Sequence, residues 1–436
     1  MASIASDSRP STSVRWRRLL PIVFVTYSLA YLDRSNYSIG AAGGLERDLH
    51  ITAATSALLG ALFFLGYFLF QIPAAHYAER GSVKRLIFWC LLAWGVLASL
   101  QGVLPWVPAL MVDRFLLGVV EAAILPAMLV FLMHWFTSRE RGRANTVLIL
   151  GNPITVLWLS ALSGWLVSVT SWQWMFIIEG IPAIIWAFVF AALTADRPAD
   201  AAWLSAPERD ALTTALREEQ RRLPEVGGYL QALRSRTVLV LSVQYLLWSI
   251  GVYGFVFWLP TIVKAGAGVG IAATGLLSAV PYVLAVILMI VVSYGSDNTG
   301  RRRVYVWPFL LVAALAFYGS YLLGPGAFWP SFALLVLAGG CMYAPYGPYF
   351  ALIPELVPQS VAGASMALVN SFGALGGFVG AYVVGWLNGS FGAGAAFVFM
   401  AIALLLAAGL MLAVPDSRVS QAGPSPAGAH ARRAPR

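Results

Sequence analysis

The sequence contains few charged residues for its length. Asp, Glu, Lys and Arg together make up 11% of its 436 residues, whereas a soluble domain carries about 25%. Hydrophobic residues make up 59% of the chain. So few charges cannot cover the surface of a water-soluble protein, and the composition therefore predicts an integral membrane protein with several spans.

Cysteine and histidine are also scarce. The two cysteines, Cys90 and Cys341, lie inside apolar runs and offer no disulfide framework. The four histidines are scattered without the spacing of metal ligands. Since the sequence also shows no nucleophile–base set, it argues against a membrane-embedded enzyme and predicts no cofactor. A sensor is disfavoured as well, because the one long polar stretch, 195–236, is too short for a signalling domain.

Long apolar runs dominate what is present. A helix needs about 20 mostly apolar residues to cross the hydrocarbon core of a bilayer. The sequence predicts an all-α membrane protein with twelve transmembrane helices in two pseudo-symmetric six-helix bundles. The predicted spans are 19–41, 56–77, 86–105, 108–134, 144–168, 173–194, 237–262, 272–294, 304–323, 330–352, 361–387 and 393–414.

The polar segments divide the chain into regions. The linker contains a charged stretch with helical character, PERDALTTALREEQRR, and the last segment is rich in Pro, Ala and Gly and is expected to be disordered. The predicted regions are a cytoplasmic tail (1–18), an N-terminal bundle (19–194), a cytoplasmic linker (195–236), a C-terminal bundle (237–414) and a cytoplasmic tail (415–436).

The basic residues predict the orientation of these spans. With the N-terminus inside, all but four of the 28 lysines and arginines lie in cytoplasmic segments. Two of the four, Arg47 and Lys264, lie in outside loops, and the other two, Arg34 and Arg114, lie within spans. Both termini are therefore expected in the cytoplasm. This distribution explains the net charge of +9 without a nucleic-acid partner and allows weak attraction to anionic lipid.

One loop pattern occurs twice. HYAERGSVKRL follows the second predicted span and YGSDNTGRRRV follows the eighth, so each half carries an acid, a small residue and two bases at the same place. Two repeated halves indicate a carrier with its site between them, although each loop alone is also explained as a positive-inside anchor. The candidate gating residues are Glu79, Arg80, Lys84, Arg85, Asp297, Gly300, Arg302 and Arg303.

The two loops resemble the signature of the major facilitator superfamily between its second and third helices. That resemblance implies the twelve-helix fold and a role for the loops in gating helix movement. The first copy departs from the pattern at Ala75, Glu79 and Ser82, and the second only at Ser293. These departures concern the details of gating rather than the fold.

Four ionisable residues fall inside predicted spans of the N-terminal half: Asp33, Arg34, Arg114 and Glu121. A charge at the bilayer centre costs about 2.5–3.5 kcal/mol on insertion scales, so such groups need a partner or a wet cavity. A purely structural ion-pair network is the alternative, but buried pairs stabilise poorly compared with apolar residues. Two further acids, Asp113 and Glu179, are interpreted as packing or gating charges.

These residues resemble motifs of the anion:cation symporter family, which imports organic anions with protons. The first span carries L-D-R at 32–34, and the fourth carries R-x-x-x-G-x-x-E-A at 114–122. The resemblance implies that Arg34 binds the substrate carboxylate and that Asp33 and Glu121 are protonation sites. It also implies that Arg114 pairs with an acid and releases it on protonation. A guanidinium suits a carboxylate independently of the resemblance, because it binds one in a bidentate fork and stays charged.

Hydroxyl and amide side chains in the spans suit a polyhydroxylated substrate. Helix packing is the alternative for each of them, through amide hydrogen bonds or aromatic contacts. Pro345 and Pro348 are expected to interrupt the tenth helix. The candidate binding residues beside Arg34 are Tyr31, Tyr67, Asn152, Tyr253, Tyr346, Tyr349, Asn370 and Ser371.

Three longer stretches are similar to bacterial 2-ketogluconate carriers: LGALFFLGYFLFQIP, LILGNPITVLW and MYAPYGPYFALIPE. The expected function is import of a sugar acid, 2-ketogluconate or a related aldonate or hexuronate, by proton symport. The expected protein is a monomer in the bacterial inner membrane, surrounded by lipid, whose partners are a small organic anion and protons. The alternatives are an exchanger or exporter of the same fold, or a carrier for tartrate or phthalate.

Overall fold

The computed structural model describes residues 12–222, 235–357 and 359–415, and all regular elements in these ranges are helical. The predicted tails lie largely outside the described residues, as does the end of the linker at 223–234. The side chain of Asp33 also lies outside the described part of the chain, although its backbone belongs to the first helix.

The helices follow the predicted spans in order, with two interruptions. A short break separates α5 from α6 within the fourth span, and another separates α14 from α15 at Pro345, which confirms the interruption expected there. Pro348 does not interrupt the chain further, because it lies in the first turn of α15, where the backbone N–H that proline lacks is not needed. The first half contains α1 (Thr12–Gly40), the π-helical turn η1 (Ala41–Leu45), α2 (Glu46–Asp48), α3 (Ala53–Arg80), α4 (Val83–Leu100), α5 (Val107–Glu121), α6 (Ile124–Trp135), α7 (Ser138–Val169) and α8 (Trp172–Leu193). The second half contains α11 (Arg236–Ala267), α12 (Ile271–Thr299), α13 (Trp307–Leu323), α14 (Phe328–Tyr343), α15 (Tyr346–Leu356), α16 (Gln359–Phe391) and α17 (Ala393–Ala413).

Eleven spans among the described residues are long and apolar enough to cross a membrane. Two of them combine consecutive helices, Val107–Trp135 and Phe328–Leu356. The first helix, α1, is not among the eleven, although its 29 residues extend about 44 Å at 1.5 Å per residue. Arg34 and Asn36 make its second half more polar than the other spans. A crossing by α1, and with it the count of twelve, stays a prediction.

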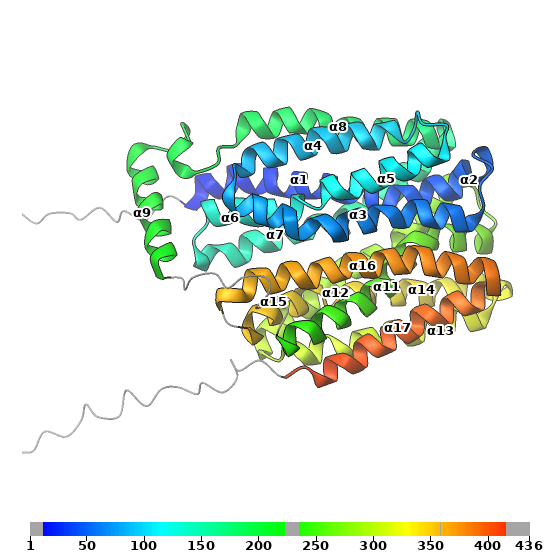
Figure 1. The fold of residues 1–436 in the computed structure, drawn as a ribbon. Helices are drawn as coiled ribbons and strands as arrows, with labels where there is room; N and C mark the ends of the chain where they lie inside the picture. Colours follow the sequence, from blue (N-terminus) through cyan, green and yellow to red (C-terminus); the bar gives the residue numbers. More distant parts are fainter. Residues whose placement is uncertain (1–11, 223–234, 358, 416–436) are drawn as a thin grey trace, which may run out of the picture.

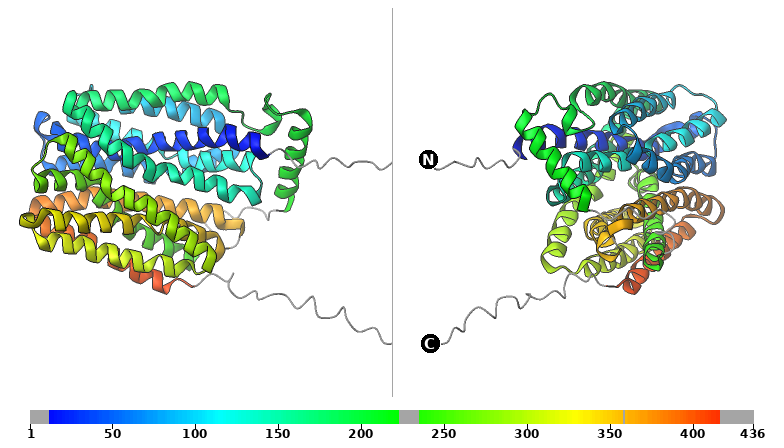
Figure 2. Two further views of the ribbon diagram at one scale, coloured as in Figure 1. Left: turned by 180° about the vertical axis from the view of Figure 1, so that it is seen from behind. Right: turned by 60° about the vertical axis from the view of Figure 1, so that its left-hand side comes forward.

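The helices gather into two halves that lie side by side. Helices α1–α8 form one half and α11–α17 the other, and Figures 1 and 2 show their axes running in roughly the same direction. We call the end at which α1 begins and α9 (Ala206–Arg222) lies the linker end, and the opposite end, with η1 and α2, the far end. The halves pack together mainly through α3 against α16 and α7 against α12.

The linker helix α9 belongs structurally to the first half. The ring of Trp203, just before α9, stacks on the ring of Trp135 with centroids 5.2 Å apart. Arg141 of α7 forms an ion pair with Glu219 of α9 at 2.9 Å. These contacts hold the linker against the linker end of α6 and α7.

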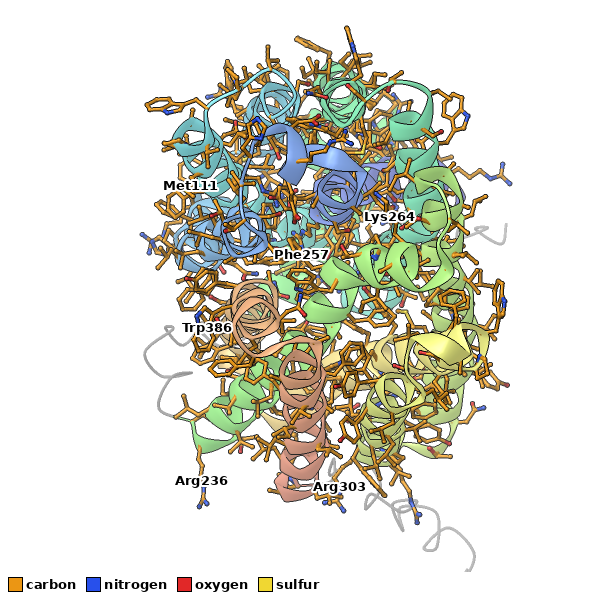
Figure 3. The ribbon with its side chains drawn as sticks, turned by 90° about the vertical axis from the view of Figure 1, so that its right-hand side faces the viewer. Met111, Arg236, Phe257, Lys264, Arg303 and Trp386 are labelled. Carbon is orange, nitrogen blue, oxygen red and sulfur yellow. The ribbon has the colours of Figure 1, made fainter. Side chains whose placement is uncertain are left out.

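The far end is closed by contacts between the halves. The ring of Tyr37 in α1 stacks on the ring of Phe257 in α11 with centroids 5.5 Å apart. The Phe257 ring lies against Gly60 of α3, where a Cβ would approach it to 2.1 Å. Lys264 of α11 donates a hydrogen bond to the carbonyl of Ala42 in η1. Figure 3, which faces this end, shows Phe257 and Lys264 where the two halves meet.

Candidate functional site

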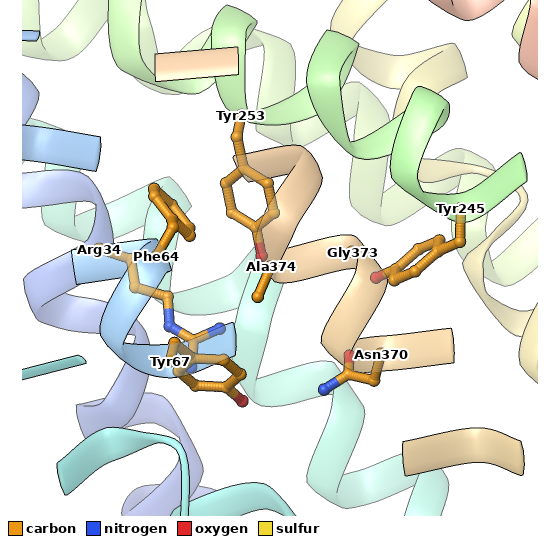
Figure 4. A pocket seen from close by; sticks show the side chains of 8 residues that line it. All are labelled: Arg34, Phe64, Tyr67, Tyr245, Tyr253, Asn370, Gly373 and Ala374. Carbon is orange, nitrogen blue, oxygen red and sulfur yellow. The ribbon is translucent and has the colours of Figure 1, made fainter. Parts of the chain in front are cut away.

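A small pocket lies between the two halves near the middle of the helices. Arg34, Phe64 and Tyr67 line it from the first half. The second half contributes Tyr245, Tyr253, Asn370, Gly373 and Ala374, and Figure 4 shows these side chains gathered around a common space. The free space is ≈ 10 Å³, about what one water molecule requires. A substrate larger than water therefore requires the lining helices to separate.

Arg34 is fixed within this pocket by an acid and two aromatic rings. Its Nε donates to Oε2 of Glu121 at 2.9 Å, and the two side chains are 7% and 0% exposed. Its Cζ lies 4.5 Å from the ring centroids of both Tyr31 and Tyr67. This ion pair joins α1 to α5, and its guanidinium faces the space that a ligand would occupy.

Close packing of α3 against α5 brings Glu121 to this position. A Cβ at Gly118 would lie 1.9 Å from the backbone oxygen of Phe63, so only glycine allows the two helices to approach this closely. Glu121 follows less than one turn later, at the end of α5. The glycine of the predicted motif therefore allows the close helix contact that positions Glu121.

Arg114 lies closer to the far end than the pocket does. Its Nε donates to the carbonyl of Leu59 and its Nη1 to Oε1 of Gln101, both at 3.3 Å. Its Cζ is 4.7 Å from the ring centroid of Tyr37, the residue that stacks on Phe257. Arg114 and its neighbour Asp113 are both buried. Arg114 thus contacts the closed far end rather than the pocket lining.

The predicted hydroxyl-binding residues separate into two groups. Tyr67, Tyr253 and Asn370 line the pocket, and Tyr31 covers one face of Arg34. The remaining members make packing contacts in this conformation. The hydroxyl of Tyr349 donates to the carbonyl of Leu241 at 2.7 Å, and that of Ser371 donates to the carbonyl of Phe68 at 3.1 Å. Tyr346 stacks among aromatic rings. Asn152 is buried and is not part of the lining.

Phe64, Tyr245 and Ala374 also line the pocket but were not among the predicted residues. Tyr245 lies against Gly373, where a Cβ would come within 2.1 Å of its ring. The glycines of α16 at 373–380 allow close helix contact of this kind. That contact is what seats the Tyr245 ring beside Asn370, so glycine spacing on α16 was the available signal.

The repeated loops make equivalent contacts in the two halves. Lys84 donates from Nζ to the carbonyl of Thr194, which ends α8, at 2.7 Å. Arg303 donates from Nη1 to the carbonyl of Val414, which ends α17, at 3.1 Å. Each loop therefore caps the last helix of its own half.

The other loop residues differ between the halves. Arg302 contacts Asp297 and forms an ion pair with Glu355 at 3.3 Å, and Gly300 ends α12 with a left-handed φ of 65°. In the first loop Glu79, Arg80 and Arg85 are exposed. Among the residues that the structure describes, no group of three or more His, Cys, Asp or Glu is placed to hold a metal ion.

Comparison with known families identifies this architecture. The model of the Major Facilitator Superfamily matches residues 23–381 and, in a second match, residues 268–435. The chain belongs to the major facilitator superfamily. The predicted all-α membrane fold is confirmed by this match, and the chain is a multi-pass membrane transporter of that superfamily.

Relatives within the superfamily are named as transporters of different compounds. A "Putative tartrate transporter" of Agrobacterium vitis is 31% identical over 412 residues, which cover 92% of this chain and 90% of that protein. A "Quinolone resistance transporter" of Acinetobacter baumannii is 29% identical and covers 91% of this chain and 92% of that protein.

Solved structures support the same fold. The crystal structure of a bacterial homologue of the human lysosomal transporter Spinster, in an inward-facing and occupied conformation, matches with a TM-score of 0.73. The match covers 93% of this chain and 97% of that one at 16% identity. At this identity the likeness concerns the major facilitator fold alone.

Proposed function

We propose that this transporter imports a hydroxylated organic anion by proton symport, and that the anion is a sugar acid such as 2-ketogluconate or a related aldonate or hexuronate. The observation that carries the proposal is Arg34, which faces a pocket between the halves while Glu121 holds its Nε. A guanidinium stays charged and binds a carboxylate in a planar fork. Tyr253, Asn370 and Tyr245 supply polar groups for hydroxyls on the opposite wall.

The Arg34–Glu121 pair provides a way to couple the anion to a proton. While Glu121 is ionised, it occupies Nε of Arg34 and competes with an incoming carboxylate. A proton on Glu121 removes that competition, so protonation favours anion binding and the anion favours protonation. Asp33, adjacent in the chain, is the proposed second protonation site.

Alternating access then requires the closed far end to open. The distribution of basic residues predicts a cytoplasmic linker end, and with that orientation the Tyr37–Phe257 contact closes the outward side. Arg114 touches Tyr37 and lies on the same helix, α5, as Glu121, so α5 contacts both the Arg34–Glu121 pair and this closure. Opening it separates α1 from α11 and enlarges the pocket.

Uptake into proteoliposomes tests this proposal. Labelled 2-ketogluconate should accumulate above its external concentration when the outside is acidic, and collapsing the pH gradient should abolish accumulation. Counterflow without a gradient should persist, because exchange requires no net proton movement. A thermal-shift screen of aldonates, keto-aldonates, uronates and tartrate identifies the anion by the stabilisation that binding produces. Accumulation that does not depend on the pH gradient would contradict proton symport.

Two alternatives are favoured by particular relatives. The likeness to a protein named as a tartrate transporter favours a smaller hydroxylated dicarboxylate, and the thermal-shift screen distinguishes it from the sugar acids. The likeness to a protein named for quinolone resistance favours export. An exporter would lower, rather than raise, substrate content in cells that express the protein, and its uptake of substrate into proteoliposomes would require an acidic interior instead of an acidic exterior.

A further inference from the structure

A second buried carboxylate lies in the same half as the Arg34–Glu121 pair but outside the pocket lining. Glu179, in α8, is 4% exposed. Asn36 of α1 donates from Nδ2 to its Oε2 at 2.9 Å, and Ser163 of α7 donates from Oγ to its Oε1 at 2.6 Å. Both oxygens are thus held by neutral donors from two other helices.

We propose that Glu179 is a further proton-binding residue of the transport cycle, separate from Asp33 and Glu121. The inference rests on the proposed proton symport and adds one proton site to it. The bound proton comes from water on the outward side and leaves to the cytoplasm within each cycle. The ligand of this site is therefore a proton, and its immediate partners are Ser163 and Asn36.

The hydrogen-bond chemistry around Glu179 accommodates both protonation states. An ionised carboxylate only accepts hydrogen bonds, and each of its oxygens has a donor here. A protonated carboxyl must donate from one oxygen, and the Ser163 hydroxyl can accept after rotating, whereas the Nδ2 of Asn36 cannot accept. The proton is therefore placed on Oε1, with its hydrogen bond directed to Oγ of Ser163.

Protonation of Glu179 would act on α1. A hydrogen bond to a charged acceptor is about twice as strong as a neutral one, so neutralising Glu179 weakens its bond to Asn36 and loosens α1 from α8. The same helix carries Arg34 in the pocket and Tyr37 at the far-end closure. A proton on Glu179 therefore eases the movement of the helix on which substrate binding and outward closure both depend.

The elements that pack against α8 carry several charged and titratable groups. The elements packed against α8 are α4, α1, α7 and η1. On α1 the nearest groups are Arg34, whose Nε bonds Glu121, and Tyr37, whose hydroxyl donates to the carbonyl of Ser56, while the side chain of Asp33 lies outside the described part. Cys90 and the basic residues at 84–85 lie on α4. Charged residues also occur at 139–143, at the linker end of α7, and at 46–48 in α2, which follows η1.

The deciding experiment measures the number of protons carried with each anion. In proteoliposomes loaded with labelled 2-ketogluconate, or the anion identified by the screen, the pH gradient that just balances a given substrate gradient gives this number. Glu179→Gln should carry one proton fewer than the wild-type chain and keep its counterflow activity. The matched control Glu218→Gln, which changes an exposed acid of α9 at the linker end, should carry the wild-type number.

The outcomes separate the two proposals. A wild-type chain that carries no protons would contradict the proposed symport itself. A wild-type chain that carries protons, with a Glu179→Gln variant that carries the same number, would overturn only the assignment of Glu179.

A second measurement decides the question if Glu179→Gln does not fold. The double variant Asp33→Asn/Glu121→Gln removes both protonation sites of the proposed mechanism. Its infrared difference spectrum between high and low pH should contain a protonated-carboxyl band that shifts when Ser163→Ala is added, because Ser163 is the hydrogen-bond partner of the protonated Glu179. A carboxyl region that Ser163→Ala leaves unchanged would overturn the proposal.

Discussion

At the residue scale, the account depends on a guanidinium that is held in place before substrate arrives. Arg34 is fixed by Glu121 on one side and by the faces of Tyr31 and Tyr67. Such preorganisation lowers the entropy lost when a carboxylate binds. A lysine offers a positive charge but neither the planar fork nor the stacking surface.

We therefore expect Arg34→Lys to weaken anion binding about 10- to 100-fold, which corresponds to about 1.5–3 kcal/mol for hydrogen bonds to a charged group. Arg34→Ala should abolish measurable binding. Isothermal titration of the purified variants measures both effects. Arg47→Lys is the control, because Arg47 lies at the far end with its side chain 84% exposed, and it should bind as the wild type does. Unchanged affinity in Arg34→Ala would refute the assignment of the site.

The residues that could be predicted at this scale are those whose charge is energetically costly inside a membrane span. A charge within an apolar span is expensive wherever the helices lie, so Arg34 and Glu121 were identifiable from sequence alone. Tyr245 was not, because an aromatic residue in a span is ordinary. Its position in the pocket depends on the pairing of α11 with Gly373 of α16, which no local pattern reveals.

At the element scale, helix crossings set the positions of the functional groups. The crossing of α3 and α5 at Gly118 is the tightest of those around the Arg34–Glu121 pair, with no room for a Cβ beside the Phe63 carbonyl. Overfilling a packed contact costs about 1–3 kcal/mol and shifts backbones. A shift of α5 would move Glu121 away from Arg34.

We expect Gly118→Ala to lower the melting temperature of the purified protein and to reduce proton-driven accumulation more than counterflow. The physical reason is that the separated helices weaken the Arg34–Glu121 pair, on which coupling depends. Gly409→Ala is the matched control, because Gly409 lies in the interior of α17 with nothing within 4 Å of a Cβ. The control should be neutral or slightly stabilising, since alanine favours helices by up to about 1 kcal/mol. Equal behaviour of the two variants would disprove the importance of this crossing.

The spans themselves were largely predictable, because an apolar run long enough to cross a bilayer has few other uses. The break at Pro345 was predictable for the same local reason, since proline cannot continue the hydrogen-bond ladder. The break between α5 and α6 at Ala122 and Ala123 was not predicted. It falls within one continuous apolar run, and only Pro126 nearby hinted at it.

At the scale of the whole molecule, the two halves meet in a conformation with the far end closed. Tyr37, Phe257 and Lys264 form this closure. The stacking of an aromatic pair contributes about 0.5–1.5 kcal/mol, so removing one ring shifts the balance between closed and open states about 2- to 10-fold.

Phe257→Ala should therefore expose the far end more often. A cysteine introduced by Ala42→Cys, in η1 beside Lys264, should react about 2- to 10-fold faster with an impermeant maleimide in the Phe257→Ala background. Trp329→Ala removes an aromatic ring that is 66% exposed and should leave the labelling rate unchanged. No acceleration in Phe257→Ala would mean that this contact does not control the closure.

The duplicated architecture was visible in the sequence through its two loops, and the equivalent contacts of Lys84 and Arg303 agree with that repeat. The closed far end was not visible. It arises from the Phe257 ring fitting against Gly60, a contact between residues far apart in the chain and on different halves. Such tertiary fits carry no periodic signal.

The central claim is that the anion and the proton share the Arg34–Glu121 pair, and the pH dependence of anion affinity tests it most directly. In the wild-type chain, affinity should fall as pH rises, because ionised acids compete for Arg34. In Asp33→Asn/Glu121→Gln, whose amides mimic protonated acids, affinity should lose most of this pH dependence and approach that of the wild type at low pH. A double variant that keeps the full pH dependence of the wild type would contradict the account.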